Sequence, residues 1–176
     1  GLRMDILTLN CGSSSVKFQV RDTERSAPLC RGLIERIGLA HGRFLYEPAG
    51  AQARESSEEF PDHRAAVGRV LAAIADPEIG VVESVQALAA VGHRVVHGGE
   101  KLHQSTIITP EVEALIEEAG RLAPLHNPAN LLGIRAVRSL LPVVPQVAVF
   151  DTGYHSTIPE EAFLYALPYE YYERHG

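Results

Sequence analysis

The chain has 176 residues, 45% of them hydrophobic and 22% charged, a balance typical of a globular protein and not of a disordered or fibrous one. Sixteen Lys and Arg against 22 Asp and Glu give a formal net charge of −6, so the basic character of a protein that binds duplex nucleic acid is missing. No apolar run approaches the roughly 20 residues of a membrane-spanning helix, and two cysteines are too few for a disulfide framework or a thiolate zinc site. We expect a cytoplasmic protein with no nucleic-acid or membrane partner.

The first part of the chain predicts β-strands. Asp5–Leu9 is apolar and β-prone, and Val16–Val20 alternates between apolar and polar residues. The short Gly/Ser-rich segment Asn10–Ser15 between them predicts a turn, so the two strands should form a hairpin. Leu29–Ile37 and Phe44–Tyr46 are predicted to add further strands.

Helical periodicity begins at His63 and ends at Asp76-Pro77. Val85–Ala90 predicts either a helical turn or the lead-in to a strand, and Val91–Val96 predicts a buried strand. The apolar stripe of the first helix consists of Val67, Val70, Leu71 and Ile74.

Two more helices are predicted before a last strand. Thr109-Pro110-Glu111 combines a hydroxyl cap, a proline and an acid in the first turn, and Asn127-Pro128 opens the next helix. Val147–Asp151 is the near-continuous apolar run of a strand covered on both faces. Strand–helix alternation after an antiparallel start predicts a layered α/β sheet. The predicted inward positions of the two helices are Val112, Leu115, Ile116 and Ala119, then Leu131, Ile134, Val137 and Leu141.

The turn Asn10–Lys17 is the first candidate site. Consecutive small residues expose backbone N–H groups and hydroxyls to a phosphate, and Lys17 adds positive charge. The Walker A spacing is absent, and a strand, not a helix, follows. The alternative is an ordinary Ser-rich turn. Cys11, with no basic neighbour, is interpreted as a small filler residue rather than a nucleophile.

Arg94 is the second candidate, because it interrupts an otherwise apolar predicted strand. A guanidinium there is costly to desolvate unless an anion or a carboxylate pairs with it. The alternative is a structural ion pair. The spacing of His93 and His97 invites a zinc interpretation, but a strand would place these side chains far apart, and no HExxH motif occurs.

His126 and Asp151 complete the set of candidates. His126 precedes a predicted helix N-terminus, where backbone donors and the helix dipole favour anions. Asp151 ends a buried strand, where ligands of open α/β sheets bind, and its carboxylate suits Mg²⁺. Each could instead be a surface or capping residue. Together with the turn and Arg94, they are the parts that phosphoryl transfer requires.

Four blocks of this sequence resemble the acetate kinase family in order and spacing: residues 7–18, 92–99, 122–128 and 150–152. The resemblance implies one lobe of the acetate and sugar kinase/Hsp70/actin superfamily, an RNase H-like, actin-like ATPase fold with a β-β-β-α-β-α-β-α core and a mixed sheet flanked by helices. It implies reversible, Mg²⁺-dependent transfer of the γ-phosphoryl group of ATP to acetate, giving acetyl phosphate and ADP.

The resemblance also assigns roles to residues. It implies that Asp151, Arg94 and His126 are catalytic, with Arg94 also binding the substrate carboxylate. The ATP phosphates are assigned to Asn10, Ser13, Ser15 and Lys17, and the metal to Asn10 and Asp151. Val96 and Leu125 match two walls of the small apolar pocket that holds the acetate methyl group.

The resemblance implies a domain division. Residues 1–3 are interpreted as an expression remnant before Met4, residues 4–151 as the N-terminal kinase lobe, and residues 152–176 as the opening segment of a truncated second lobe. We expect the 176-residue chain alone to be inactive and the full-length parent to be a homodimer. Propionate or butyrate kinase, pyrophosphate as the phosphoryl donor, a non-catalytic phosphate- or nucleotide-binding fragment and a protein-interaction domain remain alternatives at this point.

Overall fold

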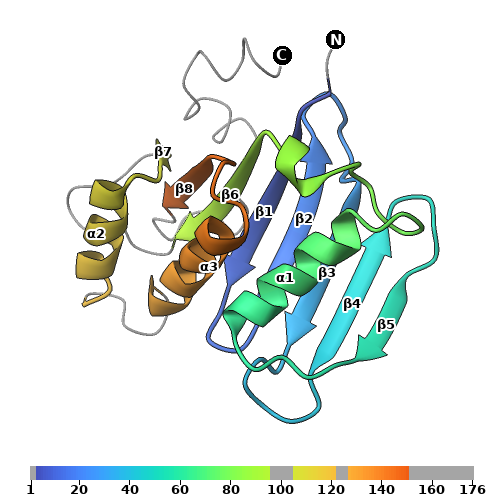
Figure 1. Ribbon diagram of the computed structural model, residues 1–176, viewed down its shortest axis with the longest axis horizontal. Coiled ribbons are helices and arrows are strands. Elements are labelled where there is room, and N and C mark those ends of the chain that lie inside the picture. The colour runs from blue at the N-terminus through green and yellow to red at the C-terminus, as the bar shows by residue number, and fades with distance from the viewer. Residues whose placement is uncertain (1–2, 96–104, 122–126, 151–176) are drawn as a thin grey trace.

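A computed structural model describes residues 3–95, 105–121 and 127–150 (Figure 1). The strands are β1 (Asp5–Cys11), β2 (Val16–Asp22), β3 (Cys30–Glu35), β4 (Arg43–Pro48), β5 (Arg54–Ser57), β6 (Ala90–Val95), β7 (Thr106–Ile107) and β8 (Gln146–Phe150). The helices are α1 (His63–Ile74), α2 (Pro110–Ala119) and α3 (Asn127–Leu140), with a 3₁₀ turn, η1, at Val85–Ala87. None of the described helices is both long and apolar enough to cross a membrane.

The strands form one mixed sheet of eight strands in the order β5-β4-β3-β2-β1-β6-β8-β7. The antiparallel meander β1 to β5 occupies one half, and β1, β6 and β8 run parallel in the other half (Figure 1). The order three strands, helix, strand, helix, strand matches the expected core, with β4, β5, β7 and α2 added to it. The final helix of the expected core would lie beyond the described residues.

Most predicted elements are confirmed, and the differences concern short edge strands. The hairpin forms as expected, with Cys11 and Val16 as its last paired residues. The sequence did not predict β5, because its four residues are all exposed and carry no apolar alternation; pairing with β4 alone makes it a strand. The two-residue strand β7 was missed for a similar reason, since it is defined by its pairing with β8.

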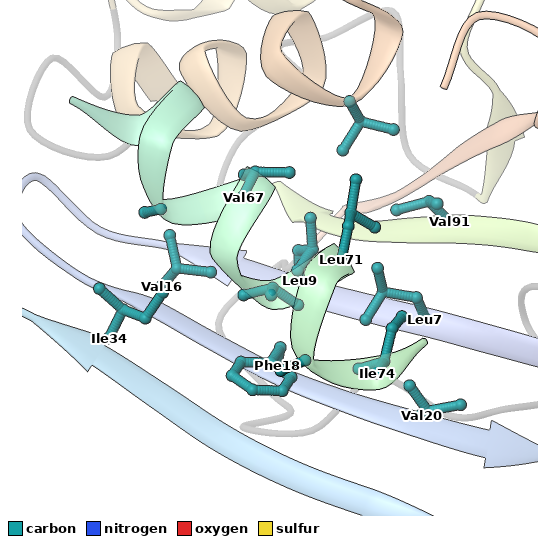
Figure 2. Packing of buried hydrophobic residues seen from close by; sticks show 14 of the residues in the cluster. Leu7, Leu9, Val16, Phe18, Val20, Ile34, Val67, Leu71, Ile74 and Val91 are labelled. Carbon is teal, nitrogen blue, oxygen red and sulfur yellow. The ribbon is translucent and has the colours of Figure 1, made fainter. Parts of the chain in front are cut away.

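Helices α1 and α3 lie against the same face of the sheet and bury its central strands (Figures 1 and 2). The core between them contains Leu7, Leu9, Phe18 and the inward face of α1. The predicted stripe of α1 is fully confirmed: Val67, Val70, Leu71 and Ile74 are all buried. In α3 and just after it, the predicted positions Leu131, Ile134, Val137 and Leu141 are buried as well.

Capping residues fix where the helices begin. Asp62 is the N-cap of α1 and accepts a hydrogen bond from the N–H of Ala65 at 2.8 Å, so His63 becomes the first helical residue. Thr109 caps α2 in the same way, with Pro110 in the first turn, as the sequence predicted. His63, the first residue of α1, is buried.

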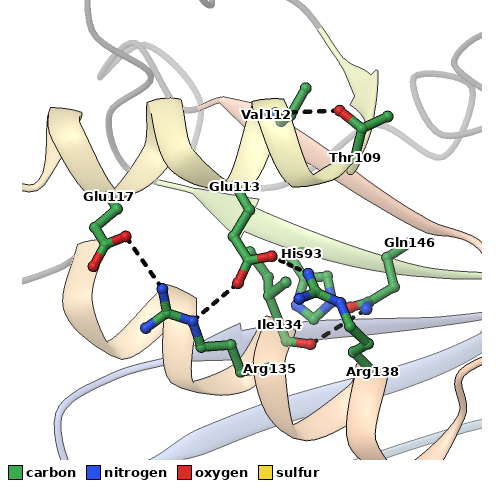
Figure 3. A network of polar contacts seen from close by, with 9 residues as sticks. All are labelled: His93, Thr109, Val112, Glu113, Glu117, Ile134, Arg135, Arg138 and Gln146. Atoms are coloured by element: carbon green, nitrogen blue, oxygen red, sulfur yellow. Dashed lines mark hydrogen bonds and ion pairs between the residues drawn. The ribbon is translucent and has the colours of Figure 1, made fainter.

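Helix α2 is tied to α3 by a partly buried charge cluster (Figure 3). The carboxylate of Glu113 accepts hydrogen bonds from Arg135, at 2.9 Å, and from Arg138. Burial by itself would raise the pKa of Glu113, but the two arginines outweigh it and the pKa is lowered. Arg135 also contacts the exposed Glu117 at 3.3 Å. This cluster orients α2 on the outer side of α3.

Candidate active site

The turn between β1 and β2 is closed by a tight local contact. The N–H of Gly12 donates to the carbonyl of Ser15 at 2.8 Å. A Cβ atom at Gly12 would lie 2.8 Å from Oγ of Ser15, so a side chain there would displace the Ser15 hydroxyl. A side chain at position 12 would therefore change the position of a hydroxyl group of the turn.

The turn presents unpaired backbone donors. In the part of the chain that the structure describes, no acceptor bonds to the N–H groups of Ser13, Ser14 or Ser15. Ser13 is exposed, and Ser14 and Ser15 are partly exposed, so water or a ligand can satisfy these donors. Successive free N–H groups in a turn form a concavity that favours anions. The turn can thus hold phosphate oxygens.

Three polar side chains share the opposite face of the sheet from α1 and α3. Leu9 and Cys11 point into the helix-covered core, so strand alternation places Asn10 on the other face. Asn10 is paired with Lys17 of β2. On the other side of β1, Leu9 is paired with His93 of β6, and the next residue is Arg94. The order of the strands is β2-β1-β6. The side chains of Lys17, Asn10 and Arg94 therefore lie next to one another at the end of β1.

The structure therefore brings together five of the predicted site residues: Asn10, Ser13, Ser15, Lys17 and Arg94. The partly buried Arg94 is paired along the strand with Val149 of β8. His126, Val96, Leu125 and Asp151 lie outside the described residues. Asp151 directly follows Phe150, the last residue of β8, in the sequence.

Two residues on the core side of the same strands are not available for chemistry. Cys11 is buried, and burial raises the pKa of its thiol to about 12, so it stays protonated, in agreement with its interpretation as a filler residue. A Cβ atom at Gly133 of α3 would lie 2.5 Å from its Sγ, so Gly133 allows the helix to pack closely here. His93 is 2% exposed and faces α3, on the other side of the sheet from Arg94.

His93 takes part in a buried polar chain (Figure 3). Its Nε2 atom lies 2.6 Å from Oε1 of Gln146, and Nε2 of Gln146 donates to the carbonyl of Ile134 at 3.2 Å. Because the Gln146 oxygen accepts, Nε2 of His93 carries the proton. Desolvation lowers the pKa of His93 to about 4 despite this hydrogen bond, so the residue is neutral at pH 7.

We expect His93 to make folding stability dependent on pH. Its folded pKa, about 4, lies below the ordinary value of 6.5, so its stabilising contribution is complete above pH 6.5 and is lost as the pH falls toward 4. Between pH 7 and pH 4 the wild-type chain should lose about 3 kcal/mol more unfolding free energy than the His93→Gln variant. Urea denaturation at several pH values measures this difference. The exposed His41→Asn variant should keep the wild-type slope; equal slopes for wild type and His93→Gln would contradict the prediction.

Sequence reasoning missed the residues that support the turn from behind. His63 of α1 contacts the carbonyl of Gly12 at 2.7 Å, and Asn130 of α3 donates to the carbonyl of Cys11 at 3.1 Å. The backbone N–H of Ile37 donates to the carbonyl of Ser14 at 2.9 Å. The only sequence signal for these contacts was the presence of polar side chains, His63 and Asn130, close to predicted helix starts.

Comparison with known proteins identifies the family of this chain. The sequence model described as the Acetokinase family matches residues 5–176. The chain belongs to this family. The resemblance found in the four sequence blocks is thereby confirmed.

Individual relatives agree with this assignment. The acetate kinase of Desulfitobacterium hafniense (strain DSM 10664 / DCB-2) is 51% identical over 172 residues, which are 98% of this chain and 43% of that protein. Among solved structures, Porphyromonas gingivalis acetate kinase matches with a TM-score of 0.81 at 43% identity. A propionate kinase from Francisella tularensis matches with a TM-score of 0.77 at 35% identity. Each of the two matches includes 98% of this chain but only 43% of the solved structure. The acetokinase chain therefore spans less than half the length of these relatives.

These matches also decide the fold class. The mixed sheet flanked by helices, together with neighbours that are acetate and propionate kinases, confirms the actin-like ATPase fold expected from the sequence. The turn of residues 12–15, called the phosphate turn after its proposed ligand, joins β1 and β2, and Asn10, Lys17 and Arg94 lie next to it.

Proposed function

We propose that this chain forms the phosphate-side half of an acetate kinase, which transfers the γ-phosphoryl group of ATP reversibly to acetate and yields acetyl phosphate and ADP. The observation that carries the proposal is the joint arrangement of unpaired turn N–H groups, Lys17 and Arg94 at the end of β1 in an acetokinase chain. Anionic donor and acceptor groups need such neutralisation before they can approach each other.

The roles of the described residues follow from their chemistry. The N–H groups and hydroxyls of Ser13 and Ser15 bind phosphate oxygens, and Lys17 neutralises their charge. The planar guanidinium of Arg94 binds the acetate carboxylate and the migrating phosphoryl group, whose equatorial oxygens need fixed donors. Holding both reactants in line supplies much of the rate enhancement, since no covalent nucleophile on the protein is required.

The remaining roles come from the family resemblance and concern Asn10 together with two residues beyond the described ones, His126 and Asp151. His126 would donate a hydrogen bond to the transferring phosphoryl group. Asn10 and Asp151 would hold Mg²⁺, which would supply positive charge to neutralise the phosphate groups. The partly exposed amide of Asn10, beside the phosphate turn, offers the oxygen ligand that this cation prefers.

The acceptor is proposed to be acetate, with propionate as the second candidate, because one structural neighbour is a propionate kinase. Val96 and Leu125 would form the apolar walls of the acyl pocket. A hydrophobic pocket discriminates one methylene group by only about 1–3 kcal/mol, so activity on the longer acid should be reduced rather than absent. Butyrate should be a poorer acceptor still.

A chimera tests the proposal. Residues 4–176 would replace the matching segment of the Desulfitobacterium hafniense acetate kinase, with that enzyme as the control. We expect ATP- and Mg²⁺-dependent formation of acyl phosphate, fastest with acetate, then propionate, then butyrate. Pyrophosphate in place of ATP should give no product. A folded chimera that binds Mg²⁺–ATP without phosphorylating any of these acids would instead indicate a non-catalytic nucleotide-binding unit.

The organisation of the complete enzyme is part of the proposal. Residues 4–151 form the first lobe and residues 152–176 open the second, so the 176-residue polypeptide assayed alone should give no measurable acetyl phosphate. The complete protein is proposed to be a cytoplasmic homodimer. Light scattering of the chimera measures its oligomeric state, and robust turnover by the isolated polypeptide would refute the division of the site between lobes.

A further inference from the structure

His63 is buried directly behind the phosphate turn. It is the first residue of α1, is 6% exposed, and places Nε2 2.7 Å from the carbonyl oxygen of Gly12. A carbonyl oxygen only accepts hydrogen bonds, so Nε2 of His63 carries the proton and donates it. The N-cap Asp62 makes a separate contact, because its carboxylate accepts a hydrogen bond from the N–H of Ala65 and not from His63.

This hydrogen bond determines the direction of a backbone donor. In a trans peptide the C=O and the following N–H point in opposite directions, and the described residues contain no cis peptide bond. Holding the Gly12 carbonyl toward α1 therefore turns the N–H of Ser13 away from the helix. That N–H is one of the unpaired donors of the turn.

A second peptide of the turn is held by a backbone contact. The carbonyl of Ser14 accepts a hydrogen bond from the N–H of Ile37 at 2.9 Å, so the N–H of Ser15 points away from Ile37. This second contact does not depend on a side chain. Of the two, only the orientation of the Gly12–Ser13 peptide rests on a single replaceable group, the imidazole of His63.

We propose that His63 is a positioning residue of the phosphate site, which sets the orientation of the Ser13 N–H before a phosphate binds. The inference rests on the proposed function for its catalytic consequence, but not for anion binding. Without the imidazole, the Gly12–Ser13 peptide can rotate, and the phosphate must then bind to a donor that is not preorganised. Its loss should weaken phosphate binding and slow phosphoryl transfer.

Amide chemical shifts of the 176-residue chain give a readout of binding without catalysis. Titration with inorganic phosphate should shift the Ser13 and Ser15 amides in the wild type. His63→Leu should weaken the apparent affinity at Ser13 by about 10-fold, the scale of one hydrogen bond. His63→Gln, whose amide can still donate to Gly12, should stay within about threefold of wild type. If the amide signals of Ser13 and Ser15 in the wild type do not shift when phosphate is added, the proposal is overturned.

Asp62→Ala is the matched structural control. It removes the cap of the same helix end, at a cost of about 1 kcal/mol of stability, but leaves the His63 side chain in place. If His63 acted only through stability, Asp62→Ala and His63→Leu variants of equal thermal stability would bind phosphate equally. Should His63→Leu not fold, His63→Asn, too short to reach Gly12, replaces it, and wild-type binding by that variant would overturn the proposal.

The chimera separates this inference from the proposed function. With ATP and acetate, kcat/KM should fall about 10-fold in His63→Leu, recover in His63→Gln and stay near wild type in Asp62→Ala. An active chimera in which His63→Leu folds and keeps the wild-type kcat/KM overturns the inference alone. A chimera that phosphorylates no carboxylic acid, while its phosphate binding still depends on His63, overturns the proposed function alone.

Discussion

Replacing Arg94 with alanine is expected to lower the kcat of the chimera with acetate by at least about 10²-fold, the effect of losing one preorganised charge contact. Arg94 follows His93 along β6 and therefore lies next to the end of β1, on the face that carries Asn10 and Lys17. No other arginine among the described residues of β1, β2 and β6 lies at that end of the sheet, so no second guanidinium can replace Arg94 there, and Lys17 offers only a single ammonium group.

Arg94→Lys tests the geometry of the contact separately from its charge. One ammonium group cannot reproduce the two parallel donors of a planar guanidinium, so this variant should also be slow, well below wild type. Arg31→Ala is the matched control, because Arg31 lies on β3 with its side chain 67% exposed and forms a surface ion pair with Glu47. Activity of Arg94→Ala within a few-fold of wild type would reject the assignment and favour a structural ion pair.

Asp151→Asn is the second substitution with a large expected effect. We expect kcat to fall at least about 10²-fold and the Mg²⁺ concentration for half-maximal activity to rise, because an amide is a weaker ligand than a carboxylate for a hard cation. The reason for choosing Asp151 is its position directly after β8, the parallel neighbour of β6, which carries Arg94.

The Mg²⁺ dependence distinguishes a ligand from a residue that only caps the strand. Glu117→Gln removes one negative charge from an exposed site on α2 and should change neither kcat nor the Mg²⁺ requirement. If Asp151→Asn lowers thermal stability but leaves both kinetic quantities unchanged, Asp151 is a capping residue and the metal must be held elsewhere.

The sequence predicted those elements whose signals are local. The helix start at Thr109 and Pro110 was predicted because a cap depends on neighbouring residues. The buried stripe of α1 was predicted because apolar periodicity reflects one covered face. Strand β5 could not be predicted in this way, since Arg54–Ser57 is polar and exposed, and only pairing with β4 defines it.

Some residues of the candidate site could likewise be found from local sequence, whereas others could be found only from the tertiary structure. Arg94 was found from the sequence because a charged residue in an apolar strand is conspicuous, and Lys17 because it follows a turn of small residues, whereas the role of Asn10 was implied by the family resemblance. Their common face followed only from the pairing of β1 with β2 and β6. His63 and Asn130 were not recognised as supports of the turn, because their partners lie 51 and 119 residues away in the chain.

The amino-acid sequence by itself determined the family, the order of the main strands and helices, and the residue types proposed to bind a phosphate, because these are properties of short segments and their order. The tertiary structure decided which turn donors remain unpaired and in which direction they point. A peptide group can be held only by atoms that folding brings to it, and here these come from the start of α1 and from Ile37.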